Sequence, residues 1–144
     1  MKTYTTFSKA DYEAFKAYDR PGPIHMLNLI RLRTKAEYPD GRKATGAQAY
    51  AEYSRISAPV FARLGGSIVW RGRFEMAMIG PPDTFWDVCF IAKYPRVAAF
   101  LEMLKDPTYR DAMAHRQAAT EDSRLIRLAP SDKGATFAGT DIIG

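Results

Sequence analysis

Alternation between apolar and other side chains marks four predicted β-strands, because successive side chains of a strand point to opposite faces. In the first, alternate residues from Ile24 to Leu32 share one face, which Asn28 interrupts with a polar group. The opposite face carries Leu27 and Leu29, so we expect this strand to be covered on both sides. A Gly-Pro-Pro-Asp turn joins the middle two strands into a predicted hairpin. The four strands are predicted over residues 24–33, 68–79, 86–94 and 123–128.

Apolar residues spaced three or four positions apart predict helices before and between these strands. The first two helices open with a capping box, in which a Ser or Thr and a side chain three residues later each bond the other's backbone. The last helix opens with Asp followed by Pro, which are typical residues at an N-cap and a first helical position. The predicted helices begin at Ser8, Thr45, Pro95 and Asp106.

The predicted elements follow the order β-α-β-β-α-β, preceded by one extra helix. This is the order of an α+β, ferredoxin-like protomer, in which a four-stranded antiparallel sheet carries its helices on one face. Because the other face is also apolar, we expect a second copy of the chain to cover it and form a homodimer. We predict a single domain over residues 1–144, with a core over 23–129, a helical extension over 1–20, and a tail or dimer arm over 130–144.

Composition and charge argue against several classes of function. The chain has 144 residues and a formal net charge of +5, but its basic and acidic residues are intermixed, unlike those of a nucleic-acid interface. No apolar run approaches the roughly 20 residues that span a membrane, and residues 1–7 lack the apolar part of a secretory signal, so we expect a cytoplasmic protein. The single cysteine, Cys89, and two histidines form no metal-binding pattern, and we predict neither a metal nor a cofactor.

Several short motifs occur in the order and spacing of one known family. They comprise a Gly pair before the second strand, an Arg-Gly within it, two tyrosines on the second helix, and two motifs on the last helix. Through them, residues 24–128 resemble the DUF1330 family of the dimeric α/β-barrel superfamily. The motifs are Gly65-Gly66, Arg71-Gly72, Tyr50 with Tyr53, Asp106–Tyr109 and Arg116–Ala119.

The resemblance implies a ferredoxin-like protomer whose sheet packs against that of its mate to form a barrel. It implies no agreed activity, because the family is one of unknown function. The wider superfamily includes cofactor-free monooxygenases, muconolactone isomerases and haem-degrading enzymes, so the fold alone does not select a chemistry. The extra N-terminal helix, the loop at residues 34–44 and the C-terminal tail depart from the family pattern.

Four residues are candidates for binding a ligand. Arg71 lies beside a glycine, where a ligand can approach the strand, and its guanidinium suits a carboxylate; the alternative is a salt bridge with Glu75, Asp87 or an acidic residue of a helix. Asn28 is a polar group on an apolar strand face and needs partners, which a ligand, a water or the backbone can supply. Arg116 matches the family's arginine, and Trp86 is a candidate pocket wall or a core or interface residue.

Three further residues are candidates for moving a proton. Tyr53 and Tyr109 lie on helices that pack on the sheet, and each is either a donor in a cleft or a core residue with a satisfied hydroxyl. His115 lies on an amphipathic helix, and the imidazole side chain suits proton transfer, although a surface histidine is the commoner outcome.

Three functions remain open from the sequence. The first is a cofactor-independent enzyme, isomerase-like or monooxygenase-like, acting on a small carboxylated or aromatic metabolite. The second is a binding protein that uses the same pocket without turnover. The third is a structural dimer whose pocket is filled by side chains. A solvent-connected cavity lined by Arg71 and Asn28 would count against the third.

Overall fold

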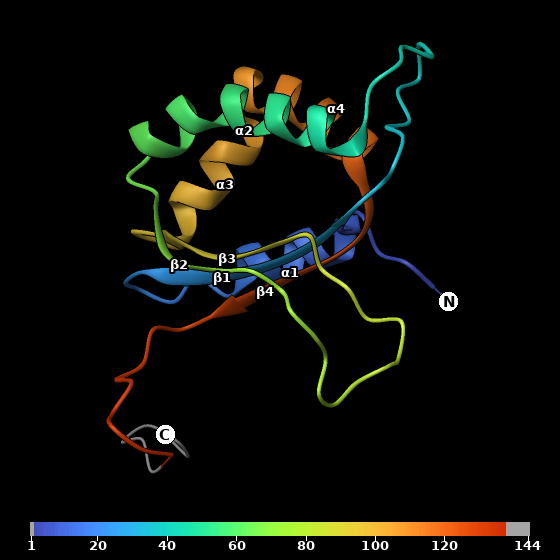
Figure 1. Ribbon diagram of the computed structural model, residues 1–144. Coiled ribbons are helices and arrows are strands. Elements are labelled where there is room, and N and C mark those ends of the chain that lie inside the picture. The colour runs from blue at the N-terminus through green and yellow to red at the C-terminus, as the bar shows by residue number, and fades with distance from the viewer. Residues whose placement is uncertain (1, 138–144) are drawn as a thin grey trace.

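A computed structural model of the chain describes residues 2–137, so part of the predicted tail or dimer arm, residues 138–144, lies outside the described residues. The described part has four helices and four strands (Figure 1). No helix of this part is both long enough and apolar enough to cross a membrane. In chain order the elements are α1 (Lys9–Ala17), β1 (Ile24–Leu32), α2 (Gly46–Arg63), β2 (Ser67–Gly72), β3 (Val88–Tyr94), α3 (Val97–Lys105), α4 (Pro107–Ala119) and β4 (Thr120–Leu128).

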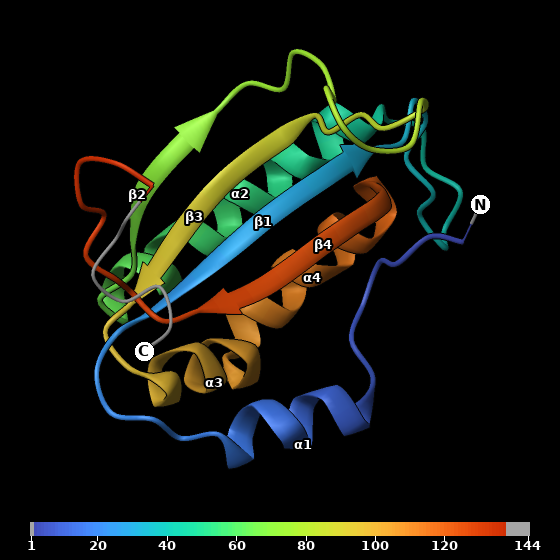
Figure 2. The ribbon, with the colours of Figure 1, turned by 90° about the horizontal axis from the view of Figure 1, so that it is seen from below.

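The strands form one antiparallel sheet in the order β2-β3-β1-β4. Helices α2, α3 and α4 lie over one face of this sheet (Figure 1), and no helix covers the opposite face (Figure 2). This is the sheet order of the split βαβ unit, so the predicted α+β, ferredoxin-like fold is confirmed. We call the uncovered side the open face.

The predicted helix starts are confirmed at three caps. The Ser8 hydroxyl accepts from the Asp11 N–H at 3.0 Å, and the Ser8 N–H donates to the Asp11 carboxylate at 3.0 Å. Thr45 caps α2 in the same reciprocal way. The Asp106 carboxylate accepts from two backbone N–H groups of the first turn of α4. Each cap satisfies N–H groups that have no partner within the helix, which fixes where the helix begins.

Two clusters of buried side chains form the core, one at each end of the sheet. The larger surrounds the start of β1 and the end of β3, under α3, and includes Ile24 (0% exposed) and Tyr94 (5% exposed). The smaller lies at the other end, where Ala49 of α2 packs near Ala118 and Ala119 of α4. The middle of the sheet, between the two clusters, is left without a full layer of packed side chains.

The second and third strands pair antiparallel as the predicted hairpin requires, but the predicted extent of the second strand and the short turn are wrong. β2 ends at Gly72, and residues 73–87 leave the sheet as a long connection on its open side (Figure 1). The chain before β3 is bound to β1, because the Asp87 N–H donates to the Ile30 carbonyl at 2.8 Å and the Asp87 carboxylate accepts from the Leu32 N–H at 2.7 Å. On the other side of β3, the pairing with β2 ends at Gly72, which is opposite Cys89.

The facing of β2 also differs from the prediction. The register shifts between Ile68, which pairs with Ala92, and Trp70, which pairs with Ile91. Ile68 therefore faces the helices while Trp70 faces the open side, although strict alternation places both on one face. At the other edge, β4 begins at Thr120, directly after α4, and not at residue 123 as predicted.

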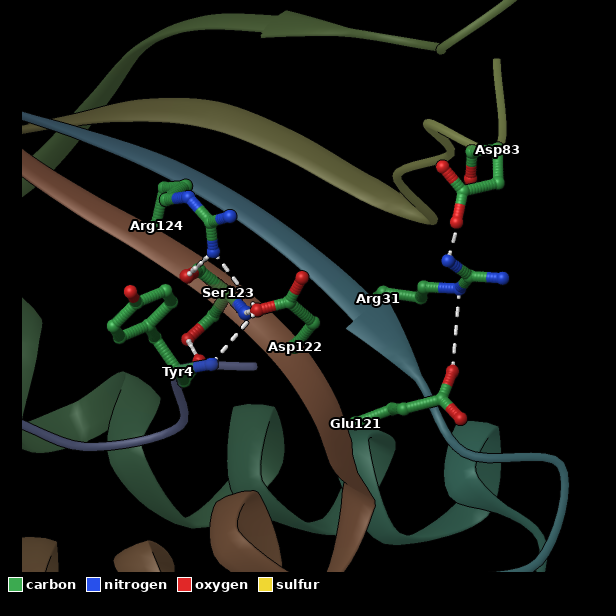
Figure 3. Close-up of polar contacts among 7 residues, drawn as sticks. All are labelled: Tyr4, Arg31, Asp83, Glu121, Asp122, Ser123 and Arg124. Carbon is green, nitrogen blue, oxygen red and sulfur yellow. Dashed lines mark hydrogen bonds and ion pairs between the residues drawn. The ribbon is translucent and has the colours of Figure 1, made fainter. Parts of the chain in front are cut away.

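The N-terminal extension lies against the free edge of β4 and against α3, not under the open face (Figure 2). The Tyr4 N–H donates to the Asp122 carboxylate at 2.9 Å, and the Ser123 hydroxyl donates to the Tyr4 carbonyl at 2.8 Å (Figure 3). Phe15 of α1 meets Phe100 of α3, with ring centroids 4.9 Å apart. This extension thus closes one side of the space between the sheet and the helices.

Candidate functional site

A cavity of about 680 Å³ lies between the sheet and the helices, a volume typical of sites for small organic molecules. The cavity lies over the middle of the sheet, between the two core clusters. Its floor includes a row of four residues, one from each strand, that are cross-strand neighbours in the sheet. Its roof comes from α2 and α4, and residues 4–7 with α1 form the wall beyond β4. The floor row is Arg71, Phe90, Asn28 and Leu125.

The wall of the cavity is rich in arginine and poor in acid. Among the described residues that line it, the one acidic side chain is Asp11, which is engaged in the cap of α1. Two of the cavity arginines already have partners in the protein. Arg124 forms an ion pair with the Asp122 carboxylate at 2.8 Å, and Arg127 donates to the backbone carbonyls of Phe15 and Tyr18. The remaining two, Arg71 and Arg116, form no ion pair within the described part of the chain.

Arg116 is held at the roof of the cavity by α4 and is 8% exposed. One guanidinium nitrogen, Nη1, donates to the Thr5 carbonyl at 3.2 Å, which ties the N-terminal segment to the roof. A guanidinium has five N–H donors, so this bond leaves others for the cavity. A desolvated cation beside a carbonyl but no carboxylate is a strong attractor for an anion.

Arg71 enters the site from β2 at the opposite edge of the sheet. Its guanidinium carbon lies 5.9 Å from the centroid of the Phe90 ring, the next residue of the floor row. The side chain is exposed, which places it near the mouth of the cavity. Neither Glu75 nor Asp87 forms an ion pair with it among the described contacts, so the salt-bridge alternative has no support in the structure.

Three tyrosines of the roof are arranged around these cations. The hydroxyls of Tyr53 and Tyr109 are 3.0 Å apart. Burial raises the pKa of Tyr109 well above its ordinary value, and the neighbouring Tyr53 adds to the shift. Burial also raises the pKa of Tyr50, with Tyr53 acting in the same direction and Arg116 and Arg71 opposing it. The hydroxyls of Tyr50 and Tyr109 therefore stay protonated near neutral pH and serve as hydrogen-bond donors, not as bases.

Asn28 occupies the centre of the floor. Its Nδ2 donates to the Met26 carbonyl at 3.0 Å, within the same strand. A carbonyl oxygen accepts and cannot donate, so the nitrogen of the amide must be the atom that faces it. The orientation of the Asn28 amide is thereby fixed, with its Oδ1 on the other side.

The structure brings five of the seven predicted site residues to this cavity and leaves two outside it. Trp86 lies on the open face, near Trp70 and Leu27, with the Arg124 guanidinium 5.4 Å from its ring centroid. His115 faces away from the cavity, and its Nδ1 is 2.6 Å from the Tyr38 hydroxyl. Those at the cavity are Asn28, Tyr53, Arg71, Tyr109 and Arg116.

Two contributions to the cavity were not expected from the sequence. Tyr50 carried a usable signal, because it precedes Tyr53 by three positions on the same helix and the two rings pack 5.4 Å apart. The wall formed by residues 4–7 carried none, since its partners are more than a hundred residues away in the chain. The described residues contain no group of three His, Cys, Asp or Glu side chains that could hold a metal ion.

Comparison with known proteins places the chain among relatives of unknown function. A crystal structure of the methylated RPA0582 protein matches it with a TM-score of 0.91 and 59% sequence identity, covering 94% of this chain and 100% of that one. A structure of the RPA0582 protein of unknown function from Rhodopseudomonas palustris gives a TM-score of 0.88 and 59% identity, covering 91% and 99%.

A more distant structure, of a dimeric protein of unknown function with a ferredoxin-like fold from Bacteroides fragilis, has a TM-score of 0.47 and 11% identity over 77% of this chain and 98% of that one. No curated protein matches the sequence. The model of the family described as "Domain of unknown function (DUF1330)" matches residues 42–128, more than half of the chain. The fold, the 59% identical relatives and this match agree with the motifs, and the chain belongs to the DUF1330 family.

Proposed function

We propose that this protein binds a small aromatic carboxylate in the cavity between its sheet and its helices. The observation that carries the proposal is the pair of cavity arginines, Arg71 and Arg116, that no carboxylate of the described residues neutralises. A cavity that offers cations and donors but almost no acidic groups selects an anionic ligand. The open volume also favours ligand binding over a purely structural role.

The rest of the wall favours a flat, apolar body on that anion. Besides the tyrosines of the roof, the rings of Phe61, Phe90 and Phe100 line the cavity. Aromatic rings pack favourably against one another in stacked or edge-to-face arrangements. A guanidinium holds a carboxylate through two parallel hydrogen bonds, which orients the ligand as well as attracting it.

The Tyr53–Tyr109 pair favours one catalytic use of the same site. A neutral hydroxyl with a raised pKa donates a hydrogen bond to negative charge that develops on a substrate oxygen, and so stabilises it. This suits a cofactor-independent reaction that passes through an enolate or phenolate, such as an isomerisation. Turnover would then depend on the pair, whereas binding depends on the arginines.

Thermal shift measurements with benzoate test the binding proposal. A ligand at a hundredfold excess over its dissociation constant stabilises a folded protein by about 2.7 kcal/mol, which for a chain of this size raises the melting temperature by roughly 5–10 °C. We expect this rise for the unmodified protein, its loss in Arg71→Met and Arg116→Met, and no rise with neutral benzamide.

The matched control is Arg73→Met, because Arg73 is an exposed arginine two positions beyond Arg71 and lies outside the cavity. Its rise with benzoate should equal that of the unmodified protein. A rise that persists in both cavity variants, or the absence of any rise with a panel of aromatic carboxylates, would overturn the proposal.

We also propose that the open face is covered by a second copy of the chain. The face presents Trp70, Ile126 and Leu128 at 50%, 44% and 41% exposure, an apolar surface of a kind that marks interfaces. Residues 73–87 leave the sheet on this same side and carry Met78 and Ile79 at 87% and 96% exposure. A two-fold axis lets both copies bury the same surface.

Light scattering tests the assembly. We expect a dimer at micromolar concentration and a monomer for Ile126→Lys, which places a charge on the apolar surface that the second copy would cover. Ala51→Lys adds the same charge on the exposed side of α2 and should remain a dimer. A monomeric unmodified protein, or a dimer that survives Ile126→Lys, would contradict the proposal.

A further inference from the structure

The Asn28 side chain presents a single free acceptor to the cavity. Because one N–H of its Nδ2 donates to the Met26 carbonyl, the amide leaves one N–H and the acceptor Oδ1 for a ligand, and Oδ1 is its only acceptor atom. No side chain or backbone group among the described residues donates to this oxygen. Among these residues, the one fully buried side-chain nitrogen or oxygen without a hydrogen-bond partner is Arg33 Nε. Asn28 Oδ1 also has no partner, so it is not fully buried. Asn28 Oδ1 is therefore reachable from the cavity and unoccupied by the protein.

The groups around this acceptor are donors. Arg71 and Arg116 supply N–H groups, and the Tyr53–Tyr109 pair, in which one hydroxyl donates to the other, supplies its remaining hydroxyl proton. A carboxylate satisfies all of them but repels Asn28 Oδ1, which can bond only a ligand group that carries a hydrogen. A ligand that leaves a desolvated acceptor unpaired forfeits affinity, so this one atom discriminates among aromatic acids.

The register of the sheet gives the spacing of the two recognition points. Arg71, Phe90 and Asn28 are direct neighbours in the floor row, so Arg71 and Asn28 are two strand spacings apart, or roughly 10 Å along the floor. The Arg71 guanidinium is drawn in over Phe90, 5.9 Å from its ring centroid. The floor between this guanidinium and Asn28 is thus formed by the Phe90 ring.

From this geometry we infer that the ligand is a hydroxylated aromatic acid and that Asn28 determines the specificity for its hydroxyl group. The carboxylate binds Arg71, the ring lies over Phe90, the hydroxyl donates to Asn28 Oδ1, and Arg116 adds positive charge from the roof. The inference rests on the proposed function and adds the second recognition point, because the arginines alone do not distinguish a hydroxylated acid from an unsubstituted one.

Calorimetric titration with matched ligands tests the inference. The probes are 3-hydroxybenzoate and 4-hydroxybenzoate, each compared with the fluorobenzoate of the same substitution, which has a similar size and no donor. We expect the unmodified protein to bind at least one hydroxylated acid about tenfold more tightly than its fluoro counterpart, as one net hydrogen bond gives. Asn28→Leu should abolish this preference and leave the affinity for fluorobenzoate within about twofold.

The outcomes separate this inference from the proposed function. If fluorobenzoates bind and the unmodified protein shows no preference for either hydroxylated acid, the role of Asn28 is wrong while the binding proposal stands. A preference that survives in Asn28→Leu has the same meaning. If none of the four probes binds, the proposed function fails. The comparison on the unmodified protein needs no variant, so it decides the question even if Asn28→Leu does not fold.

Discussion

Removal of one hydroxyl from the Tyr53–Tyr109 pair should destabilise the protein nearly as much as removal of both. The two hydroxyls are 3.0 Å apart, and Tyr109 is 5% exposed. Tyr53→Phe leaves the Tyr109 hydroxyl buried without its partner, which costs about 1–2 kcal/mol of unfolding free energy. Tyr109→Phe should cost about 1 kcal/mol, because Tyr53 is less buried and water from the cavity can reach its hydroxyl.

The double variant removes both groups, so no polar atom is left stranded. Its loss should be about 1 kcal/mol, which is less than the sum of the single losses by about 1–2 kcal/mol. Urea unfolding of the four proteins measures this coupling, provided that the slope of the transition stays constant. Losses that simply add would refute the reasoning, because they would show that the two hydroxyls do not depend on each other.

Tyr94 offers a matched control for this cycle. It is also a buried tyrosine, 5% exposed, but its hydroxyl donates to the Met103 sulfur at 3.8 Å and not to Tyr53. The losses for Tyr53→Phe and Tyr94→Phe should therefore add within about 0.5 kcal/mol.

Three further predictions concern stability and the N-terminal wall. Burial raises the pKa of Tyr50, Tyr94 and Tyr109 above the ordinary value of 10, so the unfolded chain loses these hydroxyl protons at lower pH than the folded protein. Stability should be unaffected below pH 10 and should fall above it by about 1.4 kcal/mol per pH unit for each tyrosine; a urea midpoint that is constant from pH 9 to 11 would contradict this. Asp122→Ala should remove the hydrogen-exchange protection of the Tyr4 amide while the amides of β1 remain protected, whereas unchanged protection at Tyr4 would mean that the carboxylate does not anchor the segment. Gly46→Ala should cost about 1–3 kcal/mol in urea unfolding, because an added Cβ would lie 1.9 Å from the Arg33 carbonyl oxygen, and a neutral result would show that the loop before α2 can move away.

Much of the fold could be predicted because its signals are local. The alternation in β1 and the capping residues act within a few positions, and the structure has the predicted strand and helix starts there. The error in β2 arose after Gly72, where the pairing with β3 ends although the alternation of side chains continues in the sequence. The alternating residues after Gly72 have no strand to pair with, and no local pattern announces that.

The candidate site was likewise predictable where its signals are local and unpredictable where it depends on residues far apart in the sequence. Asn28 and Arg71 were singled out because a polar residue on an apolar face and an arginine beside a glycine are visible in the sequence. That both belong to one row of the floor depends on strand register, which the sequence leaves open. Trp86 shared the alternation of the cavity residues on β3, but it precedes the strand, which begins at Val88, and lies on the open face.

The N-terminal wall of the cavity has a consequence for how a ligand is exchanged. Helix α1 has no buried residue, and its segment is held by a few hydrogen bonds at Tyr4, Thr5 and Arg127 and by contacts of its aromatic rings with Phe100 and two arginines. Segments with so little buried surface detach at a fraction of the free energy that global unfolding requires. Under the proposed function, the binding chamber would open and reseal at this flank while the sheet and its helical roof stay intact, and the residence time of a ligand would be set there.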